Sequence, residues 1–230
     1  MLKLSSCLIA NGRFQLQANL HVEAGSSVAV IGPSGAGKST LLEAIAGFRE
    51  LSQGRIFWKK QELTKQAPGK RPIAMLFQDG NLFPHLTAAQ NAALGLRPDG
   101  KLSKPEQEQV DAALVRVGLA GMGARKPAEL SGGQQSRVAL ARVLVQHRDL
   151  LLLDEPFAAL GPALKAEMLD LVADLVAETG TTLLMVSHDP QDARRITNKA
   201  ILVADGSAHP PAETQQLLNN PPQALREYLG

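Results

Sequence analysis

Gly32-Pro33-Ser34-Gly35-Ala36-Gly37-Lys38-Ser39 is the stretch that decides the fold, because it fits the phosphate-binding pattern G-x-x-x-x-G-K-[ST]. Residues 28–31 before it are apolar and β-branched, as in a buried strand, and residues 38–48 after it have helical periodicity. Glycines let backbone N–H groups turn inward around phosphate oxygens, and the start of a helix adds partial positive charge. A glycine-rich turn that matches by chance is the alternative, and the flanking strand and helix argue against it. The sequence therefore predicts a nucleotide-phosphate site from Gly32 through Thr40.

A second motif, at residues 150–155, supplies two carboxylates directly after four leucines that indicate a buried strand. In nucleoside triphosphatases with a phosphate loop, the loop Lys bridges the β- and γ-phosphates, and the loop Ser and a strand-end Asp hold Mg²⁺. We therefore expect Lys38 to contact phosphate, and Ser39 and Asp154 to hold Mg²⁺, Asp154 through a water molecule. Glu155 is the residue expected to orient or deprotonate the attacking water. A strand that merely ends in solvated carboxylates is the alternative.

Composition limits the class of protein. The chain has 230 residues, 44% of them apolar and 20% charged, which is ordinary for a soluble globular protein with one domain or one domain plus a subdomain. The formal net charge of +2 gives no basic excess, so no nucleic acid is expected as a partner. The single cysteine, Cys7, excludes an internal disulfide and is expected in the core. No apolar run is long enough to span a bilayer.

Strand and helix patterns alternate along the chain, which predicts a parallel α/β core. The first residues differ, because their alternating pattern predicts an antiparallel sheet, and the stretch from 82 to 123 has no strand pattern and indicates a helical insert. The expected parallel strands are 28–31, 73–77, 150–153, 181–186 and 200–204, and the antiparallel ones are 2–9, 13–22 and 55–58. The expected helices are 38–48, 105–117, 134–145 and 163–178, with a short helical tail around 211–228.

Leu130-Ser131-Gly132-Gly133-Gln134 stands at the start of an expected helix, where Ser is a common N-cap and two glycines are unusual. This pentapeptide resembles the signature sequence of ATP-binding-cassette (ABC) ATPases. The resemblance implies that it binds the ATP γ-phosphate of a partner subunit. It therefore implies a homodimer in which two chains, arranged head to tail, form two equivalent composite sites.

Two single polar residues follow expected strands, Gln78 after 73–77 and His188 after 181–186. Ligands bind at the carboxyl edge of a parallel sheet, so both are candidates for the same site, although a lone Gln or His is more often a surface or capping residue. The resemblance implies that Gln78 contacts Mg²⁺ and water, and that His188 contacts the γ-phosphate. The catalytic set expected is thus Glu155, His188 and Gln78, and the metal set is Ser39, Gln78 and Asp154.

The resemblance covers the whole chain and implies a phosphate-loop ABC cassette fold. This fold has a RecA-like parallel-sheet core with an antiparallel β subdomain and a helical insert. The core and β subdomain would comprise residues 1–81 and 148–230, and the helical subdomain with the signature about 82–147, with no C-terminal regulatory domain. Residues 75–78, 81–87 and 90–91 resemble bacterial importer ATPases, which implies a membrane permease and, indirectly, a periplasmic solute-binding protein as partners. Leu82, Phe83 and Leu86 are candidates for the permease contact or for the core of the helical subdomain.

Among importers, the resemblance is to ATP-binding subunits of thiamine importers, and it rests on residues 1–4, 94–96, 101–102, 183–188 and 203–206. It implies an ATPase that drives thiamine uptake from the cytoplasmic face of the bacterial inner membrane, as a peripheral subunit. The alternatives are other small solutes (iron, sulfate or molybdate, polyamine) or a soluble ABC machine acting on DNA or ribosomes. The soluble machine fits poorly, because the chain has a single cassette and lacks heptads and cysteine pairs.

The sequence departs from the family pattern at three places. Asn11 stands where the family has an aromatic residue that stacks on adenine, and Phe14 is a possible substitute. Ala158-Ala159-Leu160-Gly161 replaces Ser-Ala-Leu-Asp, and Gln135-Ser136-Arg137 stands where Arg-Gln-Arg is frequent. These departures predict weaker ATP affinity or looser cooperation between sites. They also motivate a degenerate, slowly hydrolysing cassette as an alternative, against which the intact Lys38, Glu155 and His188 argue.

Overall fold

One mixed sheet runs through the molecule in this computed structural model, which describes residues 1–78 and 80–229 apart from the side chains of residues 11 and 227–229. Its strands follow the order β5-β4-β1-β2-β10-β9-β3-β8-β7-β6, and β11 pairs with β9. The strands are β1 (Leu2–Asn11), β2 (Phe14–Val22), β3 (Ser27–Ile31), β4 (Gln53–Trp58), β5 (Gln61–Glu62), β6 (Ile73–Leu76), β7 (Leu150–Asp154), β8 (Thr182–Val186), β9 (Lys199–Ala204), β10 (Ser207–Ala208) and β11 (Ala212–Glu213).

The parallel half of the sheet consists of β9, β3, β8, β7 and β6, as the alternation of strand and helix patterns predicted. Every residue of β8 is buried, and so are the four leucines of β7, because both faces of this half are covered. In the register, Val30 of β3 pairs with Val186 of β8, which in turn pairs with Asp154 of β7. The carboxyl ends of these strands therefore lie level at one edge of the sheet.

The antiparallel half pairs β1 with both β2 and β4. Burial alternates along β2, so one face points to a core shared with α1 (Lys38–Ala46) and with alternate residues of β7 and β8. The predicted inner face of α1 is buried, including Leu41, Leu42 and Ile45, and Cys7 is buried in the same core. The last residue of α1 is Ala46, two residues before the expected end at Phe48, because Gly47 adopts a left-handed conformation with φ 91° and caps the helix.

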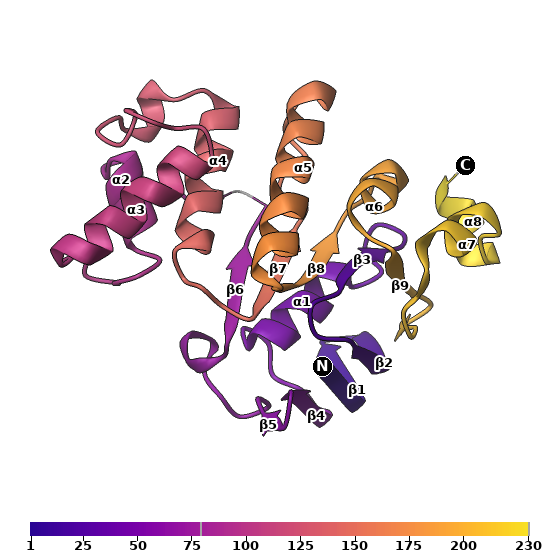
Figure 1. Ribbon diagram of the computed structural model, residues 1–230. Helices are drawn as coiled ribbons and strands as arrows, with labels where there is room; N and C mark the ends of the chain where they lie inside the picture. The colour runs from indigo at the N-terminus through magenta and orange to yellow at the C-terminus, as the bar shows by residue number, and fades with distance from the viewer. Residues whose placement is uncertain (79, 230) are drawn as a thin grey trace.

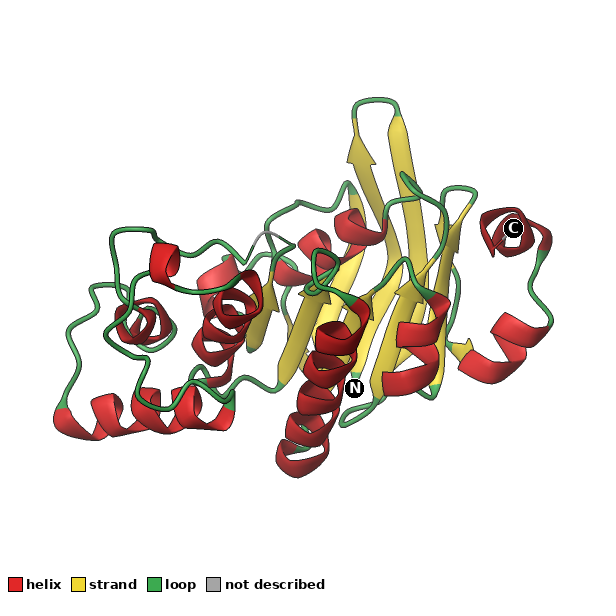
Figure 2. Ribbon diagram, turned by 90° about the horizontal axis from the view of Figure 1, so that it is seen from above, coloured by secondary structure: helices red, strands yellow, loops and turns green. Residues whose placement is uncertain are grey.

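Helices cover the opposite face and the two edges of the parallel half. Besides α1, they are α2 (Ala88–Ala93), α3 (Lys104–Arg116), α4 (Gly132–Leu144), α5 (Pro162–Thr179), α6 (Pro190–Ile196), α7 (Thr214–Asn219) and α8 (Gln223–Leu229). Figure 1 shows α2, α3 and α4 together beyond the β6 edge, and α7 and α8 beside β9 on the other side; Figure 2 shows the same separation from above. In the residues described, none of these helices is long and apolar enough to cross a membrane.

The predicted elements agree with the structure except at their ends and in the tail. In the described part of 82–123 the chain contains helices and no strand, as expected. The tail expected around 211–228 begins with β11 and contains two helices rather than one, because Pro221 and Pro222 interrupt it.

A buried arginine stabilises the end of α1 that is remote from the phosphate-binding stretch. The Arg71 Nη1 donates hydrogen bonds to the carbonyls of Ala44 (2.9 Å) and Ile45 (2.7 Å), and its Nε donates to that of Gln66 (3.0 Å). Only 3% of Arg71 is exposed. Its cationic donors thus satisfy the Ile45 carbonyl at the end of the helix and supplement the Gly47 N–H at the Ala44 carbonyl.

We predict that Arg71→Met lowers the free energy of unfolding by roughly 2–4 kcal/mol, because it removes the guanidinium donor of the Ile45 carbonyl and one of two donors of the Ala44 carbonyl. Urea denaturation measures the effect. The matched control is Lys70→Met, which removes the charge of an exposed neighbour and should change stability by less than about 0.5 kcal/mol. Equal losses in the two variants would contradict the capping role.

Candidate nucleotide-binding site

The phosphate loop, residues 32–39, follows β3 at the carboxyl edge of the sheet, and its last two residues begin α1. Gly32, Gly35 and Gly37 have φ values of 148°, 75° and 104°, which favour glycine. A Cβ on Gly32 would run into the Val203 carbonyl, and one on Gly37 would lie 2.5 Å from Cζ of Phe14. Gly37 is also the N-cap of α1, where a residue without a side chain leaves the first N–H groups of the helix to an anion.

Lys38 extends back over this loop. Its Nζ donates hydrogen bonds to the carbonyls of Gly32 and Pro33, both at 2.9 Å, and 7% of the residue is exposed. Burial lowers the pKa of the Lys38 ammonium, against the raising effect of the Glu155 and Asp154 carboxylates. The ammonium is therefore held where a phosphate oxygen could compete for its donors.

Ser39 and Asp154 come together from α1 and β7. The Ser39 hydroxyl donates to Oδ1 of Asp154 at 3.0 Å. Burial raises the pKa of the Asp154 carboxyl, against the lowering effect of the Ser39 hydrogen bond. A hydroxyl and a carboxylate are hard oxygen donors, which fit Mg²⁺. Gln78 lies exposed two residues beyond β6, whose last residue pairs with Leu153, so it projects from the same edge of the sheet.

Glu155 and His188 form the second close pair at this edge. Oε2 of Glu155 lies 3.2 Å from Nδ1 of His188. Glu155 has a left-handed backbone with φ 46°, and its N–H donates to the Val186 carbonyl at 3.2 Å. A glutamate in this conformation is strained, which is frequent where a backbone must aim a functional side chain. The strand-end residues expected at one site thus meet at one sheet edge.

The signature pentapeptide starts α4. The Ser131 side chain accepts a hydrogen bond from the N–H of Gln134, and the Gln134 side chain accepts one from the N–H of Ser131, so the two form a capping box. Ser131 and Gly132 are exposed, whereas Leu130 is buried. Gly133 is packed so closely on Leu164 of α5 that a Cβ would overlap that side chain. The exposed start of α4 is therefore a surface available to another molecule.

Two of the positions that depart from the family pattern are Asn11 and Gly161. The Asn11 side chain lies outside the described residues. Phe14 is half-buried and packs beside Gly37 of the phosphate loop, so it is an aromatic group next to the site. Gly161 is the N-cap of α5 with φ −63°, and a Cβ there would meet no atom within 4 Å. The helix after Glu155 thus begins without a side-chain cap, and a larger residue would fit.

Sequence reasoning missed the polar residues around His188. Lys165 of α5 lies 2.6 Å from Oδ2 of Asp189 and 2.8 Å from Oδ1 of Asp192. The sequence Asp189-Pro190 is a typical N-cap followed by Pro at the first helical position, so the start of α6 could have been identified. The partner on α5 could not, because it is 24 residues away from Asp189 and reaches it through tertiary packing.

Comparison with known proteins gives the following similarities. The family model described as "ABC transporter" matches residues 16–158. "Thiamine import ATP-binding protein ThiQ" of Ruegeria sp. (strain TM1040) is 65% identical over 230 residues, covering 100% of both chains. The protein of the same name from Cereibacter sphaeroides is 57% identical, again over 100% of both chains. The dimeric post-hydrolysis structure of the ATP-binding cassette MJ0796 bound to ADP and Pi superposes with a TM-score of 0.80 at 29% identity, covering 93% of this chain and 99% of that one.

We predict that Asp154→Asn stabilises the nucleotide-free protein at pH 7, although it removes a predicted metal ligand. Burial raises the pKa of Asp154 in the folded state, so its ionisation favours unfolding. The destabilisation grows as the pH rises through the unfolded pKa of about 4 and is complete above the folded pKa. Urea denaturation at pH 7 and at about pH 3.5 measures it, and the gain should be present at the higher pH only. A variant less stable than the parent at pH 7 would contradict this.

Proposed function

Since this chain belongs to the ABC transporter family, we propose that it is the ATP-hydrolysing subunit of a bacterial thiamine importer. The observation that carries the proposal is full-length identity of 65% to a thiamine import ATP-binding protein. The local geometry supports hydrolysis, because the phosphate loop, the Ser39–Asp154 pair and the Glu155–His188 pair lie at one sheet edge. Iron, sulfate, molybdate and polyamine remain the alternative solutes, since this subunit would not contact the solute itself.

In this proposal the phosphate loop from Gly32 to Thr40 cradles the ATP phosphates with its N–H groups, and Lys38 bridges the β- and γ-phosphates. Ser39, Gln78 and, through water, Asp154 would hold Mg²⁺. When bound, Mg²⁺ would neutralise charge on the phosphate oxygens. Support comes from the 3.0 Å approach of the Ser39 hydroxyl to Asp154 and from the ADP-bound structural relative.

Glu155 would accept a proton from water as the water oxygen attacks the γ-phosphorus, while the bond to the bridging oxygen breaks and releases ADP. His188, 3.2 Å from Glu155, would donate a hydrogen bond to the γ-phosphate and hold it in line. Both groups must be correctly placed at once, because small displacements in such a site reduce the rate strongly.

We propose that the site is completed by a second copy of the chain, through residues Leu130 to Gln134. The exposed N-terminus of α4 at Ser131 and Gly132 suits a γ-phosphate, since both N–H groups and helix charge favour an anion. Solved relatives with TM-scores of 0.80 and 0.81 are described as dimeric. The expected assembly is a head-to-tail homodimer with two equivalent sites.

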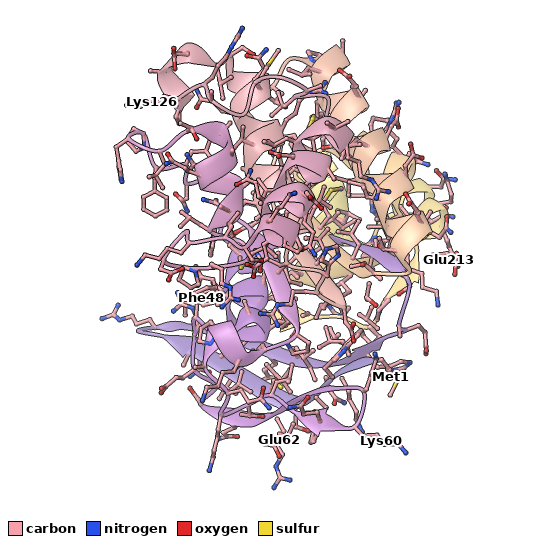
Figure 3. The ribbon with its side chains drawn as sticks, turned by 60° about the vertical axis from the view of Figure 1, so that its left-hand side comes forward. Met1, Phe48, Lys60, Glu62, Lys126 and Glu213 are labelled. Atoms are coloured by element: carbon pink, nitrogen blue, oxygen red, sulfur yellow. The ribbon has the colours of Figure 1, made fainter. Side chains whose placement is uncertain are left out.

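Exposed aromatic residues that precede and follow Gln78 in the chain are candidates for the contact with the proposed permease. Phe48 is 56% exposed and packs edge-to-face on Phe77 with ring centroids 5.5 Å apart, and Phe83 is 46% exposed. Figure 3 shows Phe48 at the outer surface, between Lys126 above and Glu62 below. Of the three candidates, Leu82 packs on the core of the helical part and Leu86 is half-buried, which leaves Phe83 as the exposed one.

We propose that an amphipathic permease helix docks on these exposed aromatic residues. The chain would then lie peripherally at the cytoplasmic face of the inner membrane. A periplasmic solute-binding protein would deliver the solute on the other side. In this assembly we assign residues 1–81 and 148–230 to the core with its β subdomain and about 82–147 to the helical subdomain.

The first test is uptake of labelled thiamine by thiamine-limited source cells. We expect deletion of the chain and Lys38→Ala each to reduce uptake to background, because Lys38 is the proposed phosphate contact. The control is the deletion strain complemented with the parent chain, which should recover uptake. Unchanged uptake in the deletion strain would remove thiamine as the required solute. Uptake lost in the deletion but normal with Lys38→Ala would argue against ATP dependence.

Gly161→Asp tests the departure after Glu155. An Asp fits the open N-cap and can accept a hydrogen bond from α5, so we predict a gain in stability of a few tenths of a kcal/mol. We also predict stronger cooperativity, measured as a higher Hill coefficient for ATP in phosphate release. Gly161→Ala is the matched control, because it fills the same space without a carboxylate. Identical rates and Hill coefficients in the parent and Gly161→Asp would refute the coupling role.

A further inference from the structure

The residues on both sides of His188 are held by one hydrogen-bond network with a lysine at its centre. Lys165 Nζ donates to Oδ2 of Asp189 at 2.6 Å and lies 2.8 Å from Oδ1 of Asp192. The other oxygen of Asp192 accepts from the Ser187 hydroxyl at 2.6 Å. Ser187 Oγ in turn accepts from the N–H of Asp189 at 3.0 Å. The backbone on each side of His188 is therefore tied to the same ammonium.

Lys165 also belongs to the segment that follows Glu155. Its helix, α5, starts at Pro162, directly after the loop that leads away from Glu155. One ammonium thus connects the element after Glu155 with the residues around His188, and these two side chains approach to 3.2 Å. The Lys165 side chain is bonded to Asp189 and Asp192 and not to Glu155 or His188 themselves. Its influence on the Glu155–His188 pair therefore passes through the backbone.

The side chains of this network are largely buried, so each charge in it needs a partner of opposite charge. The side chain of Lys165 is 18% exposed and that of Asp192 is 11% exposed. Burial by itself lowers the pKa of Lys165, but hydrogen bonds to Asp189 and Asp192 outweigh it and raise the pKa. The ammonium is needed there, because two adjacent carboxylates without a cation would repel each other. Its loss should displace Asp189 and Asp192, and with them His188.

We propose that Lys165 is a positioning residue for hydrolysis, which fixes His188 relative to Glu155 without contacting the nucleotide. This rests on the proposed function, in which Glu155 and His188 act on the γ-phosphate and its water. It deepens that function by giving the pair a third group, located on a different helix.

A second ion pair between the same two helices provides a matched control. Arg195 of α6 donates two hydrogen bonds to Asp170 of α5, both at 2.6 Å, and the two side chains are 46% and 55% exposed. It joins α5 to α6 as Lys165 does, but it does not include the neighbours of His188. Its removal therefore reports what the loss of an interhelical ion pair does by itself.

The experiment measures ATP-dependent phosphate release by the assembled importer. We expect Lys165→Met to lower kcat by between about tenfold and a hundredfold, with KM for ATP within about twofold of the parent. Lys165→Arg should recover most of kcat, because it restores a cation that reaches both carboxylates. Arg195→Met should retain parental kcat. If Lys165→Met folds poorly, Asp192→Asn removes one network charge in nearly the same volume and should lower kcat in the same way.

The outcomes separate this proposal from the one on which it rests. Glu155→Gln is assayed in parallel, and hydrolysis at the parental rate in that variant would refute the proposed catalytic site and the positioning role with it. If Glu155→Gln is inactive but Lys165→Met matches Arg195→Met, the positioning role alone is wrong. It is also wrong if kcat per folded molecule is unchanged once thermal unfolding is taken into account, or if Lys165→Arg recovers nothing.

Discussion

The parallel hydrogen-bond register of β3, β8, β7 and β6 is the constraint on which the rest of the structure depends. Because Val30, Val186 and Asp154 are level across three strands, the residues that follow each strand emerge at the same edge. Ligands in parallel α/β sheets bind there for this reason. A slip of one residue in β7 would turn Asp154 to the other face of the sheet, away from Ser39. The apolar sequences of these strands, covered on both faces, are what fix the register.

The desolvated charges and the strained backbone of the site lower the stability of the folded protein, and packing of the surrounding hydrophobic cores offsets this cost. Lys38 and Asp154 are both partly desolvated, as the opposite directions of their pKa changes indicate, and Glu155 is held in a left-handed conformation. Such strain and burial persist only where neighbouring structure determines the backbone. Here two cores do so, one beneath α1 and the antiparallel strands and the other beneath α4 and α5. Catalytic geometry and core packing are therefore parts of one arrangement.

Local sequence patterns were sufficient for the longer strands and helices and for the meeting of strand ends, but they missed α6 and the contacts between helices. Strand runs and helical periodicity depend on neighbouring residues, so the strand carrying Asp154 and the helix after Lys38 could be predicted. The tether of α5 to Asp189 and Asp192 depends on how two helices pack, and periodicity does not encode which charged side chains will meet. The same holds for Arg71, whose carbonyl partners are more than 25 residues away in α1. The sequence also does not show that Leu82 packs on the core while its neighbour Phe83 is exposed, because this depends on tertiary structure.

The hydrogen bonds already present in the site indicate what binding would have to achieve. Lys38 donates to carbonyls of its own loop, and Ser39 donates to Asp154, so phosphate and metal would replace existing interactions as well as add new ones. The net gain for one chain is then smaller than its number of polar contacts suggests, because exchanged hydrogen bonds contribute little. The signature residues Ser131 and Gly132 are exposed in the single chain, and closing a second chain over the nucleotide would remove them and the γ-phosphate from water together. Hydrogen bonds are stronger in such a desolvated site, so the larger gain on binding ATP would come from this closure, which is what a subunit that converts ATP binding into motion requires.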